Sequence, residues 1–243
     1  VFDLANTVRV NDFRGQNELQ IVWEDARLVT PGIAAIAPEV PKLDIVDYRR
    51  EPHPLTLLKP LLALENLQIW REGPLSGDIP GGNRNELTAA ATLVIWTSPP
   101  GPDVWRAVMA KVSPTTVYLF AVDAGLARLE PFLKHIAGLV KYALKHNEGR
   151  VDLSAMAAAT ANRESAIRLA LAWLEARGDI TIASEEGNTM TLRIGGERTD
   201  LRADRVAVQL AALLDEVAAY RRYFARADME ALRTLMLENG NNE

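Results

Sequence analysis

The fold is decided by residues 126–194, which read LARLEPFLKHIAGLVKYALKHNEGRVDLSAMAAATANRESAIRLALAWLEARGDITIASEEGNTMTLRI. Apolar side chains recur at helical spacing over 129–144, and this periodicity predicts a first helix, which Gly149 ends. A short alanine-rich helix over 152–159 follows, and after a turn a third helix is predicted over 165–177. The two shorter helices share one apolar face, formed by Leu153, Met156, Ile167, Leu171 and Leu174.

Two β-rich segments complete this stretch. Residues 179–183 and 189–194 flank a turn at Glu186, Gly187 and Asn188, which predicts a hairpin. The order helix, helix, helix and hairpin, with short connections, indicates a winged helix-turn-helix in residues 126–200. A module of this kind usually contacts nucleic acid or another protein and performs no chemistry itself.

Strands and helices alternate upstream of this module, after a linker at residues 31–41. Predicted strands cover 43–48, 67–70, 92–96 and 116–122, and predicted helices cover 53–64 and 102–112. The continuous apolar run at 92–96 is typical of a strand buried in a parallel sheet. We therefore expect a mixed α/β fold, in which residues 31–125 form a small layer with parallel strands. The helix over 126–146 is expected to belong to both units, so that they share one body.

Further elements are expected at the two ends of the chain. Two β-like runs at residues 1–10 and 18–29 are joined by a turn-rich junction at 11–15, which makes residues 1–30 a β-piece too small to be stable alone. At the other end, residues 201–243 contain an amphipathic helix over 204–224 and a shorter one over 228–237. Four parts result, with boundaries at 1–30, 31–125, 126–200 and 201–243.

The composition excludes several classes of function. The 243 residues carry a net charge of −5, so any contact with nucleic acid must come from local basic patches. The absence of cysteine excludes disulfides and thiol catalysis and favours a cytoplasmic location. No run approaches the roughly 18 apolar residues of a membrane span, so we expect no membrane partner. The chain begins at Val1, in strand-like sequence, and we expect it to be a piece of a longer protein.

No pattern of catalytic or metal-binding residues is visible. His53, His135 and His146 lie far apart in the sequence, and we interpret each as structural. Strand alternation puts the neighbouring acids Glu24 and Asp25 on opposite faces, where they cannot share an ion. The glycine-rich loop at 77–83 lacks the Gly-Lys-Ser/Thr ending of a P-loop. We expect no catalytic residue and no cofactor in this chain.

Basic side chains gather in three places that are candidates for DNA binding. In the first helix of the winged module, spacings of seven and four put Lys134, Lys141 and Lys145 on one face. The third helix carries Arg163, Arg168 and Arg177 against Glu164 and Glu175, and this excess of one positive charge is thin for major-groove reading. Asn162 and Arg163 lie where base contacts would start. The mixture of basic and aromatic residues needed for single-strand stacking is found in Arg9, Asn11, Phe13, Arg14, Gln20, Trp23 and Arg27.

Two interpretations follow from this distribution. For the winged module, an architectural or protein-contact role ranks slightly above sequence-specific reading of DNA. A further cluster, formed by Arg221, Arg222 and Arg226, is interpreted as part of a solvated helix face.

Residues 8–15, VRVNDFRG, followed by 19–27, LQIVWEDAR, resemble the last strands of the OB-fold domain of RecJ single-strand-specific exonucleases. The resemblance continues at DIVDYR over 44–49, at the strand that ends in Pro99 and Pro100, and at VYLF over 117–120. It ends with the winged segment and YRRYF over 220–224. These motifs span most of the chain, and the N-terminal ones are the most specific.

The resemblance implies a parent enzyme that degrades single-stranded DNA in the 5′→3′ direction during DNA repair and recombination. In that family a two-metal centre, with manganese or magnesium, lies in an Asp-His-His core, which this chain lacks. The resemblance therefore implies an accessory C-terminal region, inactive alone. Its partners would be single-stranded DNA, bound weakly, and a single-strand-binding protein or a helicase. A winged-helix transcriptional regulator with an α/β sensor domain and a pure interaction scaffold remain as alternatives.

Overall fold

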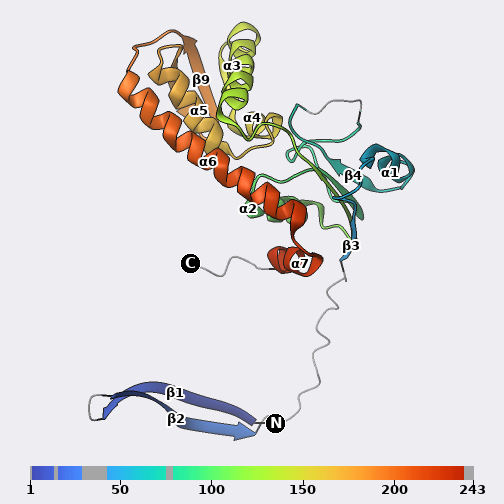
Figure 1. The fold of residues 1–243 in the computed structure, drawn as a ribbon, viewed down its shortest axis with the longest axis vertical. Coiled ribbons are helices and arrows are strands. Elements are labelled where there is room, and N and C mark those ends of the chain that lie inside the picture. Colours follow the sequence, from blue (N-terminus) through green and yellow to red (C-terminus); the bar gives the residue numbers. More distant parts are fainter. Residues whose placement is uncertain (1, 14–15, 29–42, 75–78, 238–243) are drawn as a thin grey trace. The chain divides into compact units, whose positions relative to one another are not determined.

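The computed structural model describes residues 2–13, 16–28, 43–74 and 79–237. The chain divides into two units, residues 1–42 and 43–243. As predicted, the fold is mixed α/β: the described residues form a four-stranded parallel sheet, a small antiparallel sheet and seven helices, besides the N-terminal strands (Figure 1).

The N-terminal unit contains an antiparallel hairpin of β1 (Phe2–Phe13) and β2 (Gln16–Leu28). The predicted junction at 11–15 is shorter than expected, because Asn11 to Phe13 continue β1 and pair with β2. The pairing passes from Asp25 to Trp23 and skips Glu24, so β2 contains a bulge there. Regular alternation is interrupted at this bulge, and the side chains of Glu24 and Asp25, expected on opposite faces, lie outside those that the structure describes.

A parallel sheet forms the centre of the second unit. Its strands are β3 (Asp44–Asp47), β4 (Leu67–Trp70), β5 (Thr92–Thr97) and β6 (Thr116–Val122), in the spatial order β3-β6-β5-β4. All three pairings are parallel, as predicted. Leu93 and Ile95 of β5 join a core with α2 (Pro102–Val112), whereas Val94 and Trp96 join a second core with α1 (Pro54–Leu61). The sheet is thus covered on both faces.

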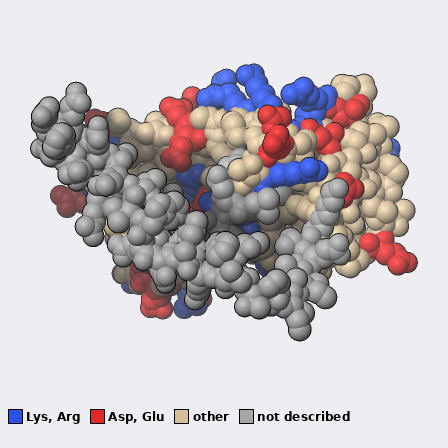
Figure 2. All heavy atoms as spheres, turned by 90° about the horizontal axis from the view of Figure 1, so that it is seen from below, with Lys and Arg blue, Asp and Glu red and all other residues tan. Residues whose placement is uncertain are grey.

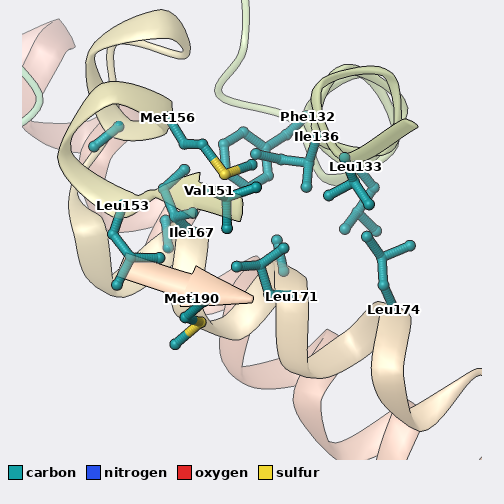
Figure 3. Close-up of a cluster of buried hydrophobic side chains, with 14 of the residues drawn as sticks. Phe132, Leu133, Ile136, Val151, Leu153, Met156, Ile167, Leu171, Leu174 and Met190 are labelled. Carbon is teal, nitrogen blue, oxygen red and sulfur yellow. The ribbon is translucent and has the colours of Figure 1, made fainter. Parts of the chain in front are cut away.

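The segment that follows has the predicted order of helices and hairpin. Its elements are α3 (Leu129–His146), β7 (Arg150–Asp152), α4 (Leu153–Ala159), α5 (Glu164–Ala176), β8 (Ile180–Glu186) and β9 (Thr189–Ile194). The three strands form an antiparallel sheet in the order β7-β9-β8, of which β7 was not predicted. Figure 3 shows how side chains from α3, α4, α5, β7 and β9 converge in one core: Phe132, Ile136, Val151, Met156, Leu171 and Met190.

Two helices complete the chain, α6 (Asp200–Arg226) and α7 (Met229–Leu237). α6 runs past α5 and on toward α2 and α7 (Figure 1). Its Leu210 and Leu214 belong to the core formed by α3, α4 and α5, whereas Phe224 lies in the core between the parallel sheet and α2. There the ring of Phe224 meets Trp105 of α2 edge to face, with the ring centroids 4.9 Å apart. One helix therefore holds both cores together.

The end of α6 is fixed by an arginine that follows the first strand of the parallel sheet. The side chain of Arg49 is 2% exposed and donates hydrogen bonds to the main-chain oxygens of Phe224 and Ala227. Its Nε and Nη2 also donate to the two carboxylate oxygens of Asp47, each over 2.8 Å. These hydrogen bonds hold the pKa of Asp47 below its ordinary value of 3.8, although burial acts in the opposite direction.

Candidate binding groove

The predicted lysine face of α3 borders a groove in the second unit. Lys134, Lys141 and Lys145 are all exposed on this helix. Lys141 and Lys145 line a hollow of about 520 Å³ that continues toward Ile180 and Ile194. Lys134 lines an adjoining hollow of about 650 Å³. The structure thus brings the three predicted lysines to the rim of one groove.

The lining of this groove is mainly apolar, with Glu130 and Asp179 as its acidic residues. Both hollows are lined by Ala137, Leu174 and Asp179, which join them into one feature, called here the α3 groove. Ile194 of β9 lies at one end and is 82% exposed. At the other end Trp173 lies beneath Arg177, whose guanidinium carbon is 4.6 Å from the ring centroid. Cationic side chains around an apolar floor suit a ligand with both acidic and apolar groups.

Arg163, which precedes α5, and Arg168 of α5 each have an acidic partner in the same chain. Arg163 donates from Nη1 to Oε1 of Glu216 on α6 over 2.7 Å, and its Nε lies 3.7 Å from Oδ1 of Asp103 on α2. Arg168 forms an ion pair with Glu185 of β8. The roles predicted for Arg163 and Arg168 in DNA binding would require these pairs to open. Helix α5 therefore does not present a basic face that is free of acidic partners.

Two expectations about polar side chains in this unit are wrong. Asn162 does not start a surface for base contacts, since it is fully buried and its Nδ2 donates to the main-chain oxygen of Leu126 over 3.4 Å. Arg221 does not lie on a solvated face, since it is 5% exposed. A sequence signal for its burial exists, because it continues the helical spacing of the buried side chains Leu210, Leu214, Val217 and Phe224.

The other predicted DNA-binding residues lie in the N-terminal hairpin. Its register places Arg9 opposite Gln20, Trp23 opposite Asn6 and Arg27 opposite Asp3. Asn11 and Phe13 pair with Glu18 and Gln16 in the same ladder. Arg14 lies outside the described residues. The hairpin thus keeps most of these residues on two adjacent strands, and their DNA-binding role remains a prediction.

Charge is mixed on the face of the molecule shown in Figure 2. In Figure 2, lysine and arginine side chains are interleaved with acidic ones rather than gathered in one continuous patch. Within residues 2–13, 16–28, 43–74 and 79–237, no group of three or more His, Asp or Glu side chains could hold a metal ion. In the same part of the chain, no helix is both long and apolar enough to cross a membrane.

Comparison of the chain with family models, with curated proteins and with solved structures finds no match. The groove, the ion pairs and the order of the elements are therefore the features from which a function can be inferred.

Proposed function

We propose that this chain is the accessory C-terminal part of a RecJ-like 5′→3′ single-stranded-DNA exonuclease that acts in DNA repair and recombination. In this role the chain binds DNA or a partner protein for a catalytic core located elsewhere in the parent enzyme. The observation that supports the proposal most is the apolar α3 groove with Lys134, Lys141 and Lys145 at its rim. A cytoplasmic location, expected from the absence of cysteine, fits this role.

The fold proposed for residues 126–200 is a winged helix. Helices α3, α4 and α5 supply its three helices, the β8–β9 hairpin supplies the wing, and β7 completes the sheet. The hairpin of β1 and β2 is assigned to the end of an OB-fold, in line with the RecJ resemblance. Both assignments are supported by element order and strand pairing.

The occupant proposed for the α3 groove is an acidic, partly apolar segment of a partner protein. Apolar side chains of such a segment would be buried against Leu174, Ile180 and Ile194. Its carboxylates would lie near the lysines at the rim, where opposite charges favour association. A single-strand-binding protein or a helicase would be the partner. DNA would be bound weakly by the hairpin residues, among them Arg9, Gln20 and Trp23.

A second candidate is a winged-helix transcriptional regulator. The succession α4, turn, α5 favours it, because a helix-turn-helix usually places its second helix in the major groove. The ion pairs of Arg163 and Arg168 with Glu216 and Glu185 disfavour the regulator, because contacts with bases need these arginine side chains to be available.

Fluorescence anisotropy tests the groove. The probe is a labelled ten-residue peptide in which aspartates precede leucine and phenylalanine, and the whole chain is titrated into it. Lys141→Glu should weaken binding at least tenfold, because it reverses a charge at the rim. Lys59→Glu, at an exposed position on α1, is the matched control and should leave affinity unchanged. Equal affinity for both variants would contradict a groove that binds acidic segments.

DNA provides the second arm of the test. A labelled single-stranded oligothymidine should bind weakly, lose affinity as salt increases, and be displaced only poorly by an unlabelled duplex of equal length. Added manganese should leave this DNA uncut. Cleavage that scales with the amount of chain, or sequence-specific binding of duplex DNA, would refute the accessory role. No binding of DNA or peptide at low salt would refute it equally.

A further inference from the structure

A separate cavity of about 470 Å³ lies where the parallel sheet meets α6. Ser98 and Asp123 reach it from the carboxyl ends of β5 and β6, and Arg128 reaches it from the loop before α3. Along α6 it is lined by Asp215, Arg221 and Arg222. The crevice outside the carboxyl ends of parallel strands is the usual place for ligands in open α/β sheets. The α3 groove has different lining residues.

Two polar side chains in this cavity are buried without full hydrogen bonding. The Oγ of Ser98, a residue 2% exposed, has no partner in the part of the chain that the structure describes. Arg221 is 5% exposed and donates from Nη2 to the main-chain oxygen of Ala161. Its Nε and Nη1 have no hydrogen-bond partner among the same residues. A buried polar group left unpaired has lost its hydrogen bonds to water without replacement, so native proteins contain few such groups.

The charge of Arg221 is only partly balanced. The nearest carboxylate oxygen, Oδ1 of Asp123, lies 3.7 Å from its Nη1, and the Asp123 side chain is 69% exposed. Burial lowers the pKa of the Arg221 guanidinium, and the charges of Asp123 and Glu72 oppose this effect without cancelling it. An arginine remains protonated in proteins, so a buried positive charge with free donors persists here.

The other lining residues define what could fill the space. Arg128 and Arg222 bring the number of guanidinium groups to three, against the two carboxylates of Asp123 and Asp215. Guanidinium groups bind the oxygens of phosphate in bidentate fashion, and a hydroxyl adds a further donor. Carboxylates accept hydrogen bonds from ligand hydroxyls. The remaining lining residues are alanines, whose small side chains leave room for a ligand larger than an inorganic ion.

We propose that this cavity binds a small phosphate monoester that also carries hydroxyl groups, such as a sugar phosphate. The phosphate accepts from Ser98 Oγ, from the free donors of Arg221 and from Arg222, and the hydroxyls donate to Asp123 or Asp215. This site is independent of the α3 groove and goes beyond the proposed accessory role.

Isothermal titration calorimetry of the whole chain tests the proposal, with ribose 5-phosphate as the probe. Ribose 5-phosphate should bind at least tenfold more tightly than inorganic phosphate, and ribose should give no heat. Citrate serves as the carboxylate arm, and a 5′-phosphorylated oligothymidine serves as the nucleic-acid arm. Tighter binding of either than of ribose 5-phosphate, or equal binding of ribose, would overturn the proposal.

Variants locate the site. Ser98→Ala removes a hydroxyl without a hydrogen-bond partner among the described residues, so the fold should be retained, and Arg222→Gln changes an exposed residue. Each should weaken ribose 5-phosphate binding at least fivefold. Arg226→Gln, one turn further along α6 and outside the cavity lining, is the matched control and should have no effect. Peptide binding in the α3 groove should be unchanged in all three. Unaltered affinity in both Ser98→Ala and Arg222→Gln would overturn the assignment.

Discussion

Arg163 at the start of α5 and Glu216 in the middle of α6 form an ion pair of 2.7 Å between residues 53 positions apart in the sequence. The pair joins the helix expected to face DNA to the helix that crosses both cores. The Arg163 side chain, which a regulator would need for contacts with bases, is therefore engaged in an ion pair within the chain.

Glu216→Gln separates the two main candidate functions. The substitution removes the negative partner of Arg163, and the Glu216 side chain is 60% exposed, so the fold should persist. In an accessory binding part, affinity for duplex DNA should change less than twofold, as measured by anisotropy at low salt. A tenfold gain would instead indicate that α5 is a recognition helix held in check by Glu216.

The pair of Asp47 and Arg49 should make stability depend on pH. The pKa of Asp47 lies below 3.8 in the folded protein, so its contribution is complete above this value and is lost as the pH falls through the folded pKa. Asp47→Asn should cost about 1 kcal/mol at pH 7, since the carboxylate is partly solvated. Urea unfolding at pH 7 and pH 3 measures this. The difference in unfolding free energy between the wild type and Asp47→Asn should be smaller at pH 3 than at pH 7.

Asp44→Asn, at the exposed start of the same strand, is the control for this measurement. If the loss of unfolding free energy in Asp47→Asn were the same at both pH values, the charge of Asp47 would not contribute to stability.

A buried ion pair at the end of β4 should be costly to break from one side. The Glu72 side chain is 1% exposed and accepts from Nε of Arg84 over 2.7 Å and from the Arg84 main-chain nitrogen over 2.9 Å. Arg84→Met leaves a buried carboxylate without its cation, so it should destabilise by about 3–5 kcal/mol. The double variant Glu72→Met, Arg84→Met should recover part of this loss. Chemical denaturation compares the unfolding free energies of the two variants. A double variant less stable than Arg84→Met would show that the unpaired Glu72 carboxylate is not the cause of the loss.

Two glycines with positive φ angles make a matched pair. Gly149 has φ +78°, and an added Cβ would lie 2.1 Å from the main-chain oxygen of Leu192. Gly187, in the β8–β9 turn, has φ +60° with nothing within 4 Å. Gly187→Ala should cost about 1–2 kcal/mol from backbone strain alone. Gly149→Ala should cost about 1–3 kcal/mol more, because the sheet must shift. Thermal unfolding measures the stability of both variants. Equal losses of stability would show that the backbone at Gly149 and Leu192 can move apart without cost.

Elements specified by local signals could be predicted from the sequence. Helix α2 spans Pro102 to Val112 as predicted, because proline suits the first turn and Ser113 after the helix adopts a left-handed conformation. Strand β4 also matches its prediction at Leu67–Trp70. The three-residue strand β7 was missed, because only pairing with β9 makes it a strand.

The candidate site was predictable in part, for a similar reason. The common face of the α3 lysines follows from helical spacing alone, and their exposure agrees with it. The apolar floor beside them depends on Leu174 and Ile194, which come from distant positions and meet only in the fold. Arg221 was misjudged because arginine is rarely buried, although its position on α6 continues the apolar stripe.

The path of α6 has a consequence for how this protein can be divided. Removing residues 201–243 would take Leu210 and Leu214 out of one core and Phe224 out of the other at once. The 43–243 segment should therefore melt in a single cooperative transition, and neither half should survive as an excised fragment. If residues 126–200 were exchanged between related proteins, α6 would have to be exchanged with them. The new α6 would then also have to fit the parallel sheet, because Phe224 packs in that core.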